Sequence, residues 1–587
     1  MKNRSWFIFV VFSLFFFISC GSDGNNDVQE DTDYADGENI AVSIRAAENI
    51  NCKDDLHIDC LSQQLTAVSF KIIDEAGETV FQKSVERKEL ADKNVPLTGI
   101  QNVDNATLIV SAFGINDNAT PKWEGKASGL KFEKGKTTSV TITLYPKDFT
   151  DQELTIPGEL TLSRFGHTST VLKDGRVLIA GGFTKCSSLG TCPASETVEI
   201  IDFESGKVES LTSMSEKRAM HTAIALNDGS VLFIGGIQRL DTNTQTSFEG
   251  FPPIHYNLSS AVVKIEKYMP PYPAYNSRHN MEKNGFGEPV ANISEPVATL
   301  SDLPFSAFQS VLAERVSDTQ IDVFLVGGLE KDGETLKPSN KSYKFTITET
   351  AEGTIAVSEP GEPVTSSEPM LLPALAYKDG SLIAAGGRPA NSEYAASIIS
   401  ENGSEDFGSP VDNIFFTKSI SANGNLYTFG GYEIDPNTGS FITNKLKLDE
   451  NGDEIKDDNG KPIAETRLNR NRTWNISEKS VTTAKDLLRS EDTNVIFPAT
   501  AYDQKNNRFL VIGGTSASRI YQAINADSLA PYDKPTTHFM TDNRIMPSVA
   551  IIPAGIINDN PVIVITGGTS AFDDTAEAVT TIKINNL

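Results

Sequence analysis

The stretch RVLIAGG, residues 176–182, decides the fold, because an apolar run that ends in two glycines recurs seven times in this chain. The copies are RVLIAGG (176–182), SVLFIGG (230–236), DVFLVGG (322–328), SLIAAGG (381–387), NLYTFGG (425–431), RFLVIGG (508–514) and VIVITGG (562–568). Their glycine pairs are Gly181 and Gly182, Gly235 and Gly236, Gly327 and Gly328, Gly386 and Gly387, Gly430 and Gly431, Gly513 and Gly514, and Gly567 and Gly568. Such repetition is typical of folds that stack one structural unit per copy. The sequence therefore predicts seven similar units.

A tight turn precedes most of these runs. Gly175, Gly229, Gly380 and Gly424 each follow Asp or Asn, six residues before a glycine pair, and Asn506-Asn507 replaces this turn in the sixth copy. An Asx-Gly turn joins antiparallel strands, an apolar run predicts a strand buried on both faces, and paired glycines let backbones approach closely. The glycine pairs could instead bind phosphate, but no helical pattern follows them, so we favour the structural interpretation.

The first two copies carry a longer signature, Arg164-Phe-Gly-His167 and Arg218-Ala-Met-His221. In this pattern the chain resembles kelch repeats, over about three quarters of its length. The resemblance implies a seven-bladed, kelch-like β-propeller of the galactose oxidase class at residues 151–587, in which these Arg and His residues and the glycine pairs are structural.

The resemblance also sets expectations for the other copies. We expect both motif His side chains to be buried and bonded to the backbone of their own blade. The later copies lack the Arg and the His, and only Trp474 stands near the position of the family's outer tryptophan. A strand at 152–156 or 159–162 is expected to pair with the last blade.

The first residues resemble a bacterial lipoprotein signal. Lys2 and Arg4 precede an apolar run at 6–18, and Cys20 follows it. The run is shorter than a spanning helix requires. The resemblance implies a signal peptide at 1–19, a lipid on Cys20 and, since Gly21 follows the Cys, transfer to the outer membrane. An ordinary cleaved signal is the alternative.

Two further segments lie before the repeats. Residues 20–38 are polar and acidic, which predicts a flexible tether. From 39 to 150 the chain alternates with a period of two, as in Val68, Phe70 and Ile72 and in Val140, Ile142 and Leu144. We predict a small β-sandwich there, immunoglobulin-like or transthyretin-like, that spaces or docks the repeats. The whole protein is expected to be all-β.

The remaining cysteines form two close pairs, Cys52 with Cys60 and Cys186 with Cys192, in short polar stretches. We predict two disulfides, as expected in an oxidising compartment. A zinc site is the alternative, but neither pair has CxxC spacing.

Composition and motifs narrow the function. Lys and Arg number 51 against 78 Asp and Glu, a net charge of −27, which excludes a nucleic-acid backbone as the main partner. No metalloprotease, nucleophile-elbow or sialidase motif occurs, and the copper ligands of galactose oxidase are not recognisable. We expect no cofactor and no enzyme activity, although a carboxylate pair acting on a glycosidic bond stays open.

Two insertions are candidate sites. Residues 449–460 alternate oxygen-bearing side chains as Ca²⁺ loops do, but depart from the EF-hand pattern, so we favour a polar hairpin. The insertion after the second glycine pair is rich in Pro and aromatic residues, which suit a binding loop. Its candidate residues are Tyr256, Tyr268, Tyr272, Tyr275, Arg278 and His279. The alternative is that these aromatics pack the loop onto its own propeller.

Together these features predict a monomeric, lipid-anchored protein of the bacterial cell envelope whose propeller binds an envelope or extracellular protein. Membrane contact is expected through the lipid alone. A carbohydrate-binding or glycan-processing protein is the alternative.

Overall fold

The protein is all-β throughout the part that the computed structural model describes. These residues are 39–46, 65–86, 97, 99–114, 117–133, 137–147, 154–241, 247–251, 257–261, 264–271, 293–299, 308–332, 335–350, 355–409, 412–422, 424–433, 445–446, 464–465, 471–484, 497–514, 521–529, 544–557, 560–571 and 579–586. They contain strands and turns but no helix, and therefore no helix long and apolar enough to cross a membrane. The predicted signal, the lipid site Cys20 and the tether lie outside these ranges.

The first six strands form one sheet. They are β1 (Asn39–Ala46), β2 (Leu65–Ile73), β3 (Thr79–Glu86), β4 (Val103–Gly114), β5 (Asp117–Phe132) and β6 (Thr137–Pro146), in the order β1-β6-β5-β4-β2-β3. All pairs are antiparallel except β1 with β6. The predicted alternation is confirmed, because Val68, Phe70 and Ile72 of β2 and Ile142 and Leu144 of β6 are buried in one core.

Seven small antiparallel sheets follow, which we number as repeats 1 to 7. Repeat 1 is β8 (Thr168–Val171), β9 (Val177–Ala180), β11 (Val198–Asp202) and β12 (Lys207–Leu211); repeat 2 is β13 (Thr222–Ala225), β14 (Val231–Ile234), β17 (Lys264–Met269) and β18 (Ile293–Thr299). Repeat 3 is β19 (Gln309–Ser317), β20 (Gln320–Gly327), β23 (Lys341–Glu349), β24 (Ile355–Val357) and β25 (Val364–Thr365); repeat 4 is β26 (Ala374–Lys378), β27 (Ser381–Ala385), β28 (Ala396–Ser400) and β29 (Gly403–Phe407). Repeat 5 is β31 (Lys418–Ala422), β32 (Asn425–Phe429), β36 (Asn471–Asn475) and β37 (Ser480–Ala484); repeat 6 is β38 (Ala499–Asp503), β39 (Arg508–Ile512) and β40 (Tyr521–Asn525); repeat 7 is β41 (Ser548–Ile552), β42 (Val562–Thr566), β43 (Thr581–Asn586) and β7 (Leu154–Glu159).

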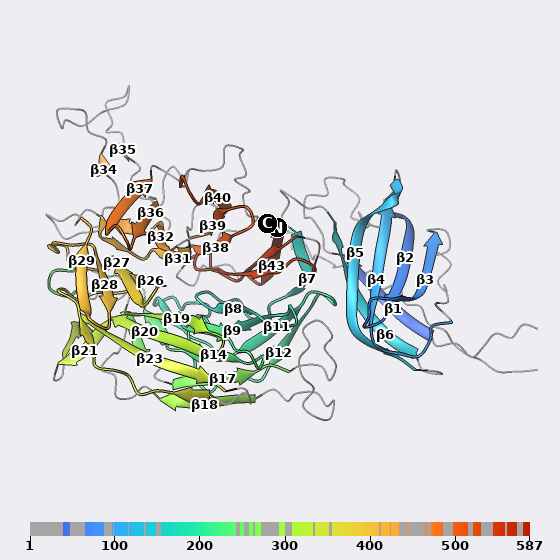
Figure 1. Ribbon diagram of the computed structural model, residues 1–587, viewed down its shortest axis with the longest axis horizontal. Helices are drawn as coiled ribbons and strands as arrows, with labels where there is room; N and C mark the ends of the chain where they lie inside the picture. Colours follow the sequence, from blue (N-terminus) through green and yellow to red (C-terminus); the bar gives the residue numbers. More distant parts are fainter. Residues whose placement is uncertain are drawn as a thin grey trace, which may run out of the picture.

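The second strand of every repeat is the apolar run found in the sequence, and its residues are almost completely buried, as predicted. Repeat 7 takes its fourth strand, β7, from the start of the repeat region, so the predicted pairing of this segment with the last strand is confirmed. Figure 1 shows the six-stranded sheet to one side of the repeats, next to β7.

The first strand of each repeat is its inner strand. Each inner strand contacts that of the next repeat, in the order β8, β13, β19, β26, β31, β38, β41, and β41 contacts β8 again. The contact order is therefore cyclic, although no sheet closes on itself by hydrogen bonds within the described ranges.

The glycine pairs join one repeat to the next. All fourteen glycines have positive φ. A Cβ on Gly181 would lie 2.2 Å from the carbonyl oxygen of Arg218 in repeat 2, so only glycine fits there. The amide of Gly182 donates to that same carbonyl at 2.9 Å, and Gly568 of repeat 7 donates to Arg164 O of repeat 1 at 2.8 Å. The predicted role of the pairs in close backbone approach is confirmed.

Nine short strands among the described residues lie outside these seven sheets, in the connections between their strands. They are β10 (Thr191–Pro193), β15 (Ile237–Asp241), β16 (Asn257–Ala261), β21 (Leu329–Asp332), β22 (Thr335–Pro338), β30 (Ile414–Phe415), β33 (Tyr432–Glu433), β34 (Lys445–Leu446) and β35 (Ala464–Glu465). We call the end of the repeats that carries the glycine pairs the glycine face, and the opposite end, which carries the Asx-Gly turns, the turn face.

The six-stranded sheet is bonded to repeat 1 through the turn between β11 and β12. The carboxylate of Glu204 accepts hydrogen bonds from the amide and hydroxyl of Ser128, at 3.1 and 3.0 Å. The buried hydroxyl of Tyr145 donates to Phe203 O at 2.7 Å. Burial, together with the nearby carboxylates of Asp202 and Glu204, raises the pKa of Tyr145 well above its usual value, so the hydroxyl stays a donor. The two parts are thus held together by direct contacts.

Candidate binding face

Seven residues in the left-handed backbone conformation mark the start of the inner strands on the glycine face. We call them the axial ring: Gly166, Met220, Phe308, Leu372, Phe416, Phe497 and Met546, one per repeat, with φ between 46° and 63°. Each stands one or two residues before its inner strand. The sequence pattern of apolar runs did not reveal this second repeat, because six of its seven members are not glycine.

Backbone hydrogen bonds connect members of the axial ring across repeats. The amide of Gly166 donates to Met546 O at 3.0 Å, and that of Met220 donates to Gly166 O at 2.7 Å. Leu372 likewise donates to Phe308 O at 2.8 Å, and Phe497 to Phe416 O at 2.9 Å. These bonds join repeats 7, 1 and 2, repeats 3 and 4, and repeats 5 and 6 around the same axis.

The backbone of the axial ring is strained. A left-handed conformation costs an L-residue roughly 1–2 kcal/mol, and bulky apolar side chains are the least suited to it. Such strain is concentrated at ligand clamps and active sites, where the surrounding structure enforces it. The ring is therefore a candidate functional feature, and its hydrogen bonds are what hold it in place.

Most of the ring side chains belong to one apolar cluster on the glycine face. Phe308, Phe416 and Met546 are buried in it, whereas Met220, Leu372 and Phe497 remain partly exposed. The cluster draws residues from the loops of several repeats: Phe165, Phe183, Cys186, Cys192, Leu240, Phe251, Leu329 and Phe415. Apolar side chains that stay partly exposed at the centre of a loop-bearing face are typical of a protein contact surface.

The insertion after the second glycine pair covers part of this cluster. The amide of Ala390 in repeat 4 donates to Gly250 O at 2.7 Å. Phe251 is buried, and its ring packs edge-on against Phe415 with the ring centroids 6.5 Å apart. At Phe251, the insertion therefore packs onto its own repeats, as the alternative interpretation of this segment expects.

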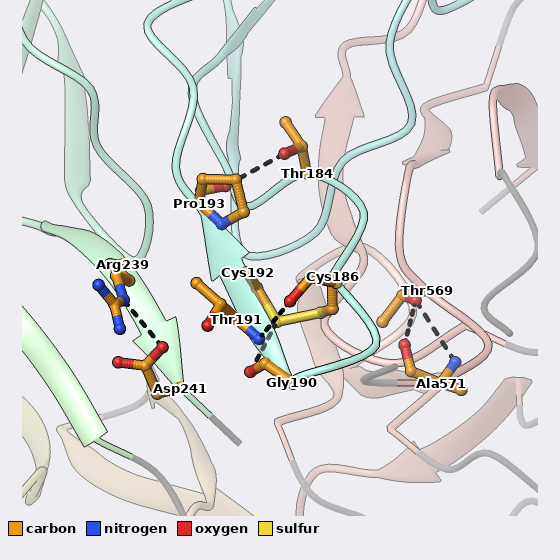
Figure 2. The surroundings of a disulfide bond; sticks show 11 residues. Thr184, Cys186, Gly190, Thr191, Cys192, Pro193, Arg239, Asp241, Thr569 and Ala571 are labelled. Carbon is orange, nitrogen blue, oxygen red and sulfur yellow. Dashed lines mark hydrogen bonds and ion pairs between the residues drawn. A yellow bond between two sulfur atoms is a disulfide. The ribbon is translucent and has the colours of Figure 1, made fainter. Parts of the chain in front are cut away.

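The Cys186–Cys192 disulfide, predicted from the sequence, is present (Figure 2). Both cysteines are buried in the apolar cluster. Cys192 lies in β10 opposite Leu240 of β15, so the bridge closes a loop that pairs repeat 1 with the insertion of repeat 2. Cys52 and Cys60 lie outside the described residues.

The predicted aromatic binding loop is only partly described. Tyr268 lies in β17 and is fully buried, and its hydroxyl donates to Thr212 O at 2.5 Å. It is a core residue, so its assignment to a binding loop is corrected. Tyr256, Tyr272, Tyr275, Arg278 and His279 lie outside the described ranges, as does the acidic insertion 449–460.

Arg164 and Arg218 are fully buried beside the glycine pairs. Arg164 donates to Gly181 O at 2.8 Å and forms an ion pair with Glu199. Arg218 donates to Gly235 O and to the Glu266 carboxylate, both at 3.1 Å. Burial lowers the pKa of both guanidinium groups, and the paired carboxylates oppose this shift. These residues are structural, as the sequence motif implies.

Repeat 7 has a third member of this set, which corrects the expectation that later copies lack the Arg. Arg544 is fully buried and donates to Gly567 O at 3.0 Å and to the hydroxyl of Thr581 at 2.9 Å. It stands eleven residues before Gly555, as Arg164 and Arg218 stand eleven before their own turn glycines. Counting eleven residues back from the turn glycine finds Arg544 in the sequence. Counting back from the glycine pair does not, because the hairpin of repeat 7 is longer than those of repeats 1 and 2.

The motif His residues join neighbouring repeats rather than bonding to their own backbone, which corrects that expectation. His167 Nε2 lies 2.9 Å from Thr566 Oγ1 of repeat 7, and His221 Nε2 lies 2.9 Å from Thr168 Oγ1 of repeat 1. Burial, reinforced by nearby Arg side chains, holds the pKa of both imidazoles well below the usual value. Both side chains are therefore neutral at pH 7.

Trp474 is a buried residue of β36, and its indole donates to Thr428 Oγ1 at 3.1 Å. Within the described ranges, no group of three or more His, Cys, Asp or Glu side chains is placed to hold a metal ion. The arrangement of the glycine face is suited to contact and recognition. No family model matches the chain, and no curated protein matches it.

Proposed function

We propose that the protein is a lipid-anchored, extracytoplasmic binding protein whose repeats form a seven-bladed, kelch-like β-propeller. The six-stranded sheet of residues 39–150, which stands where the sequence predicted a β-sandwich of two sheets, would dock this propeller. The cyclic order of inner-strand contacts supports the propeller, as does the hydrogen bond from Gly568 back to Arg164. A ring of sheets leaves only short, protected edges.

One observation carries the binding function. Side chains from six of the seven repeats meet on the glycine face at a strained ring, and three of them, Met220, Leu372 and Phe497, remain partly exposed. An apolar centre with large side chains that remain partly exposed is typical of a surface that recognises another protein. The proposed partner is an envelope or extracellular protein.

The proposed cellular location rests on the amino-terminal sequence and on the cysteines. The apolar run before Cys20 resembles a lipoprotein signal, and the Cys186–Cys192 disulfide is compatible with an oxidising compartment outside the cytoplasm. We propose that the lipid on Cys20 anchors the protein in the outer membrane.

A cross-linked pull-down from intact cell envelopes tests the function. The tagged full-length protein is the bait, and both proteins and glycans are identified in the material that co-purifies. A discrete, stoichiometric protein is the expected result. Glycan without any stoichiometric protein would contradict the proposal and favour a carbohydrate-binding role.

A further inference from the structure

Lys418 stands out in a second ring of residues next to the axial ring. Two residues after each axial-ring member, the inner strands carry Thr168, Thr222, Ser310, Ala374, Lys418, Ala499 and Ser548. Six of these side chains are small. Because neighbouring inner strands are in contact, the seven positions lie at the same level around the axis, and Lys418 is the one long, charged side chain among them.

Hydrogen bonds at equivalent positions show which way Lys418 points. At its level, Thr168 bonds to His221 and Ser310 donates to Pro373 O, so these side chains point to the following repeat. Since side chains alternate along a strand, the next residue points the other way. Ser169 accordingly bonds to Thr566 and Ser419 to Leu375 O, both in the preceding repeat.

This pattern directs Lys418 of repeat 5 and Thr500 of repeat 6 toward each other. Lys418 is the first residue of β31, a position whose side chains point to the following repeat. Thr500 is the second residue of β38, a position whose side chains point to the preceding repeat. The strands β31 and β38 are in contact. The two side chains therefore face the same space between the inner strands.

Both polar groups lack a partner among the described residues. The Oγ1 atom of Thr500 is buried without a hydrogen bond, although its equivalents Ser169 and Ser419 each form one. The side chain of Lys418 is exposed and forms no ion pair within the described ranges, and the protein around its ammonium lowers its pKa. A cation without a counter-ion is stabilised when an anion binds beside it.

We propose that Lys418 and the hydroxyl of Thr500 bind a carboxylate on an acidic loop of the protein partner. The inference rests on the proposed binding function, and it names the chemical group that these two residues would recognise on the partner. Phe416 and Phe497 of the axial ring lie two and three residues before these groups, so the site combines one cation with apolar neighbours. That combination suits a single acidic residue flanked by apolar ones. A polyanion would be repelled by the net charge of −27.

The test uses the full-length protein with its lysines dimethylated with ¹³C, followed by NMR. The Lys418 resonance is assigned by its loss in Lys418→Met. The probes are N-acetyl-glutamyl-phenylalanine amide, its glutaminyl counterpart and inorganic phosphate. We expect the glutamyl probe to shift the Lys418 resonance saturably and the glutaminyl probe to bind at least about ten-fold more weakly, as loss of a charged hydrogen-bond acceptor predicts.

Two variants complete the test. Thr500→Val is expected to weaken binding of the glutamyl probe several-fold. Lys505→Met, in the exposed turn at the other end of β38, is expected to leave this binding unchanged. Equal shifts with both dipeptides, or a shift with phosphate alone, would overturn the carboxylate site. If the envelope pull-down retains its protein partner in Lys418→Met at unchanged yield, this inference fails while the proposed binding function stands.

Discussion

Repeats 7, 1 and 2 differ from repeats 5 and 6 in the polar side chains that stand beside their inner strands. In the first group, buried Arg544, Arg164 and Arg218 bond to the glycine-pair carbonyls, and two neutral His side chains bond to threonines of the preceding repeat. At the His position, repeats 5 and 6 carry Thr417 and Pro498 instead, followed by Lys418 and Ala499. The comparison teaches that the His side chains of repeats 1 and 2 bond to the preceding repeat, whereas Thr500 Oγ1 and the ammonium of Lys418 have no hydrogen-bond partner among the described residues.

The largest effect is expected from removing a buried Arg. Arg164→Met leaves the Glu199 carboxylate buried without its cation, which should lower the free energy of unfolding by about 3–5 kcal/mol. Denaturant unfolding followed by circular dichroism measures the loss. The control is Arg239→Met, because Arg239 pairs with Asp241 at 2.8 Å but is half exposed. Equal losses in the two variants would refute the internal role of the Arg.

A glycine at the junction of repeats 7 and 1 should come next. A Cβ on Gly567 would lie 2.4 Å from Arg164 O, and its φ is 55°, so Gly567→Ala should cost about 2–3 kcal/mol. Gly555→Ala is the matched control, because that glycine also has positive φ but open space around it, and should cost about 1 kcal/mol. Indistinguishable melting temperatures for the two variants would mean that the contact between the last and first repeats contributes little.

These glycines illustrate how much of the fold the sequence predicts. The apolar runs, the Asx-Gly turns and the pairing of β7 with β43 were all accessible, because each depends on a short local pattern. The axial ring was not, since residues such as Phe416 and Leu372 adopt positive φ only because neighbouring repeats hold their backbone. Lys418 was missed for the same reason: its significance lies in the small side chains at equivalent positions of six other sheets.

The disulfide offers a third comparison within repeats 7, 1 and 2. Replacing both Cys186 and Cys192 with Ala should lower the free energy of unfolding by about 2 kcal/mol, because the bridge closes a short loop. The wild-type protein and the double variant are unfolded in parallel, with and without reductant. The difference in the free energy of unfolding between the two proteins should disappear once the wild type is reduced. A gap that persists under reductant would assign the effect to packing in the apolar cluster instead.

The smallest effect is expected from pH. The folded-state pKa of His167 and His221 lies below the unfolded value of about 6.5. At acid pH the unfolded chain therefore binds protons at these residues that the folded chain does not bind. Their contribution is complete above that pH and is lost as pH falls below it, by up to about 1.4 kcal/mol per pH unit for each His. Unfolding of His167→Gln and the wild type at pH 7.5, 6.5 and 6.0 measures it, and over this range each His contributes up to about 1 kcal/mol. The free energy of unfolding should fall less steeply with decreasing pH in the variant than in the wild type. Parallel plots of this free energy against pH would contradict the account.

The central claim is that the glycine face, at the axial ring, contacts a protein partner. The most direct measurement places a photo-crosslinking residue at Leu372, which is partly exposed in the ring, or at Asp379, in the turn at the other end of β26. Each full-length lipoprotein is irradiated in intact cell envelopes. We predict one discrete cross-linked protein from position 372 and none from 379. Cross-linking from 379 alone would place the contact on the turn face and contradict the account.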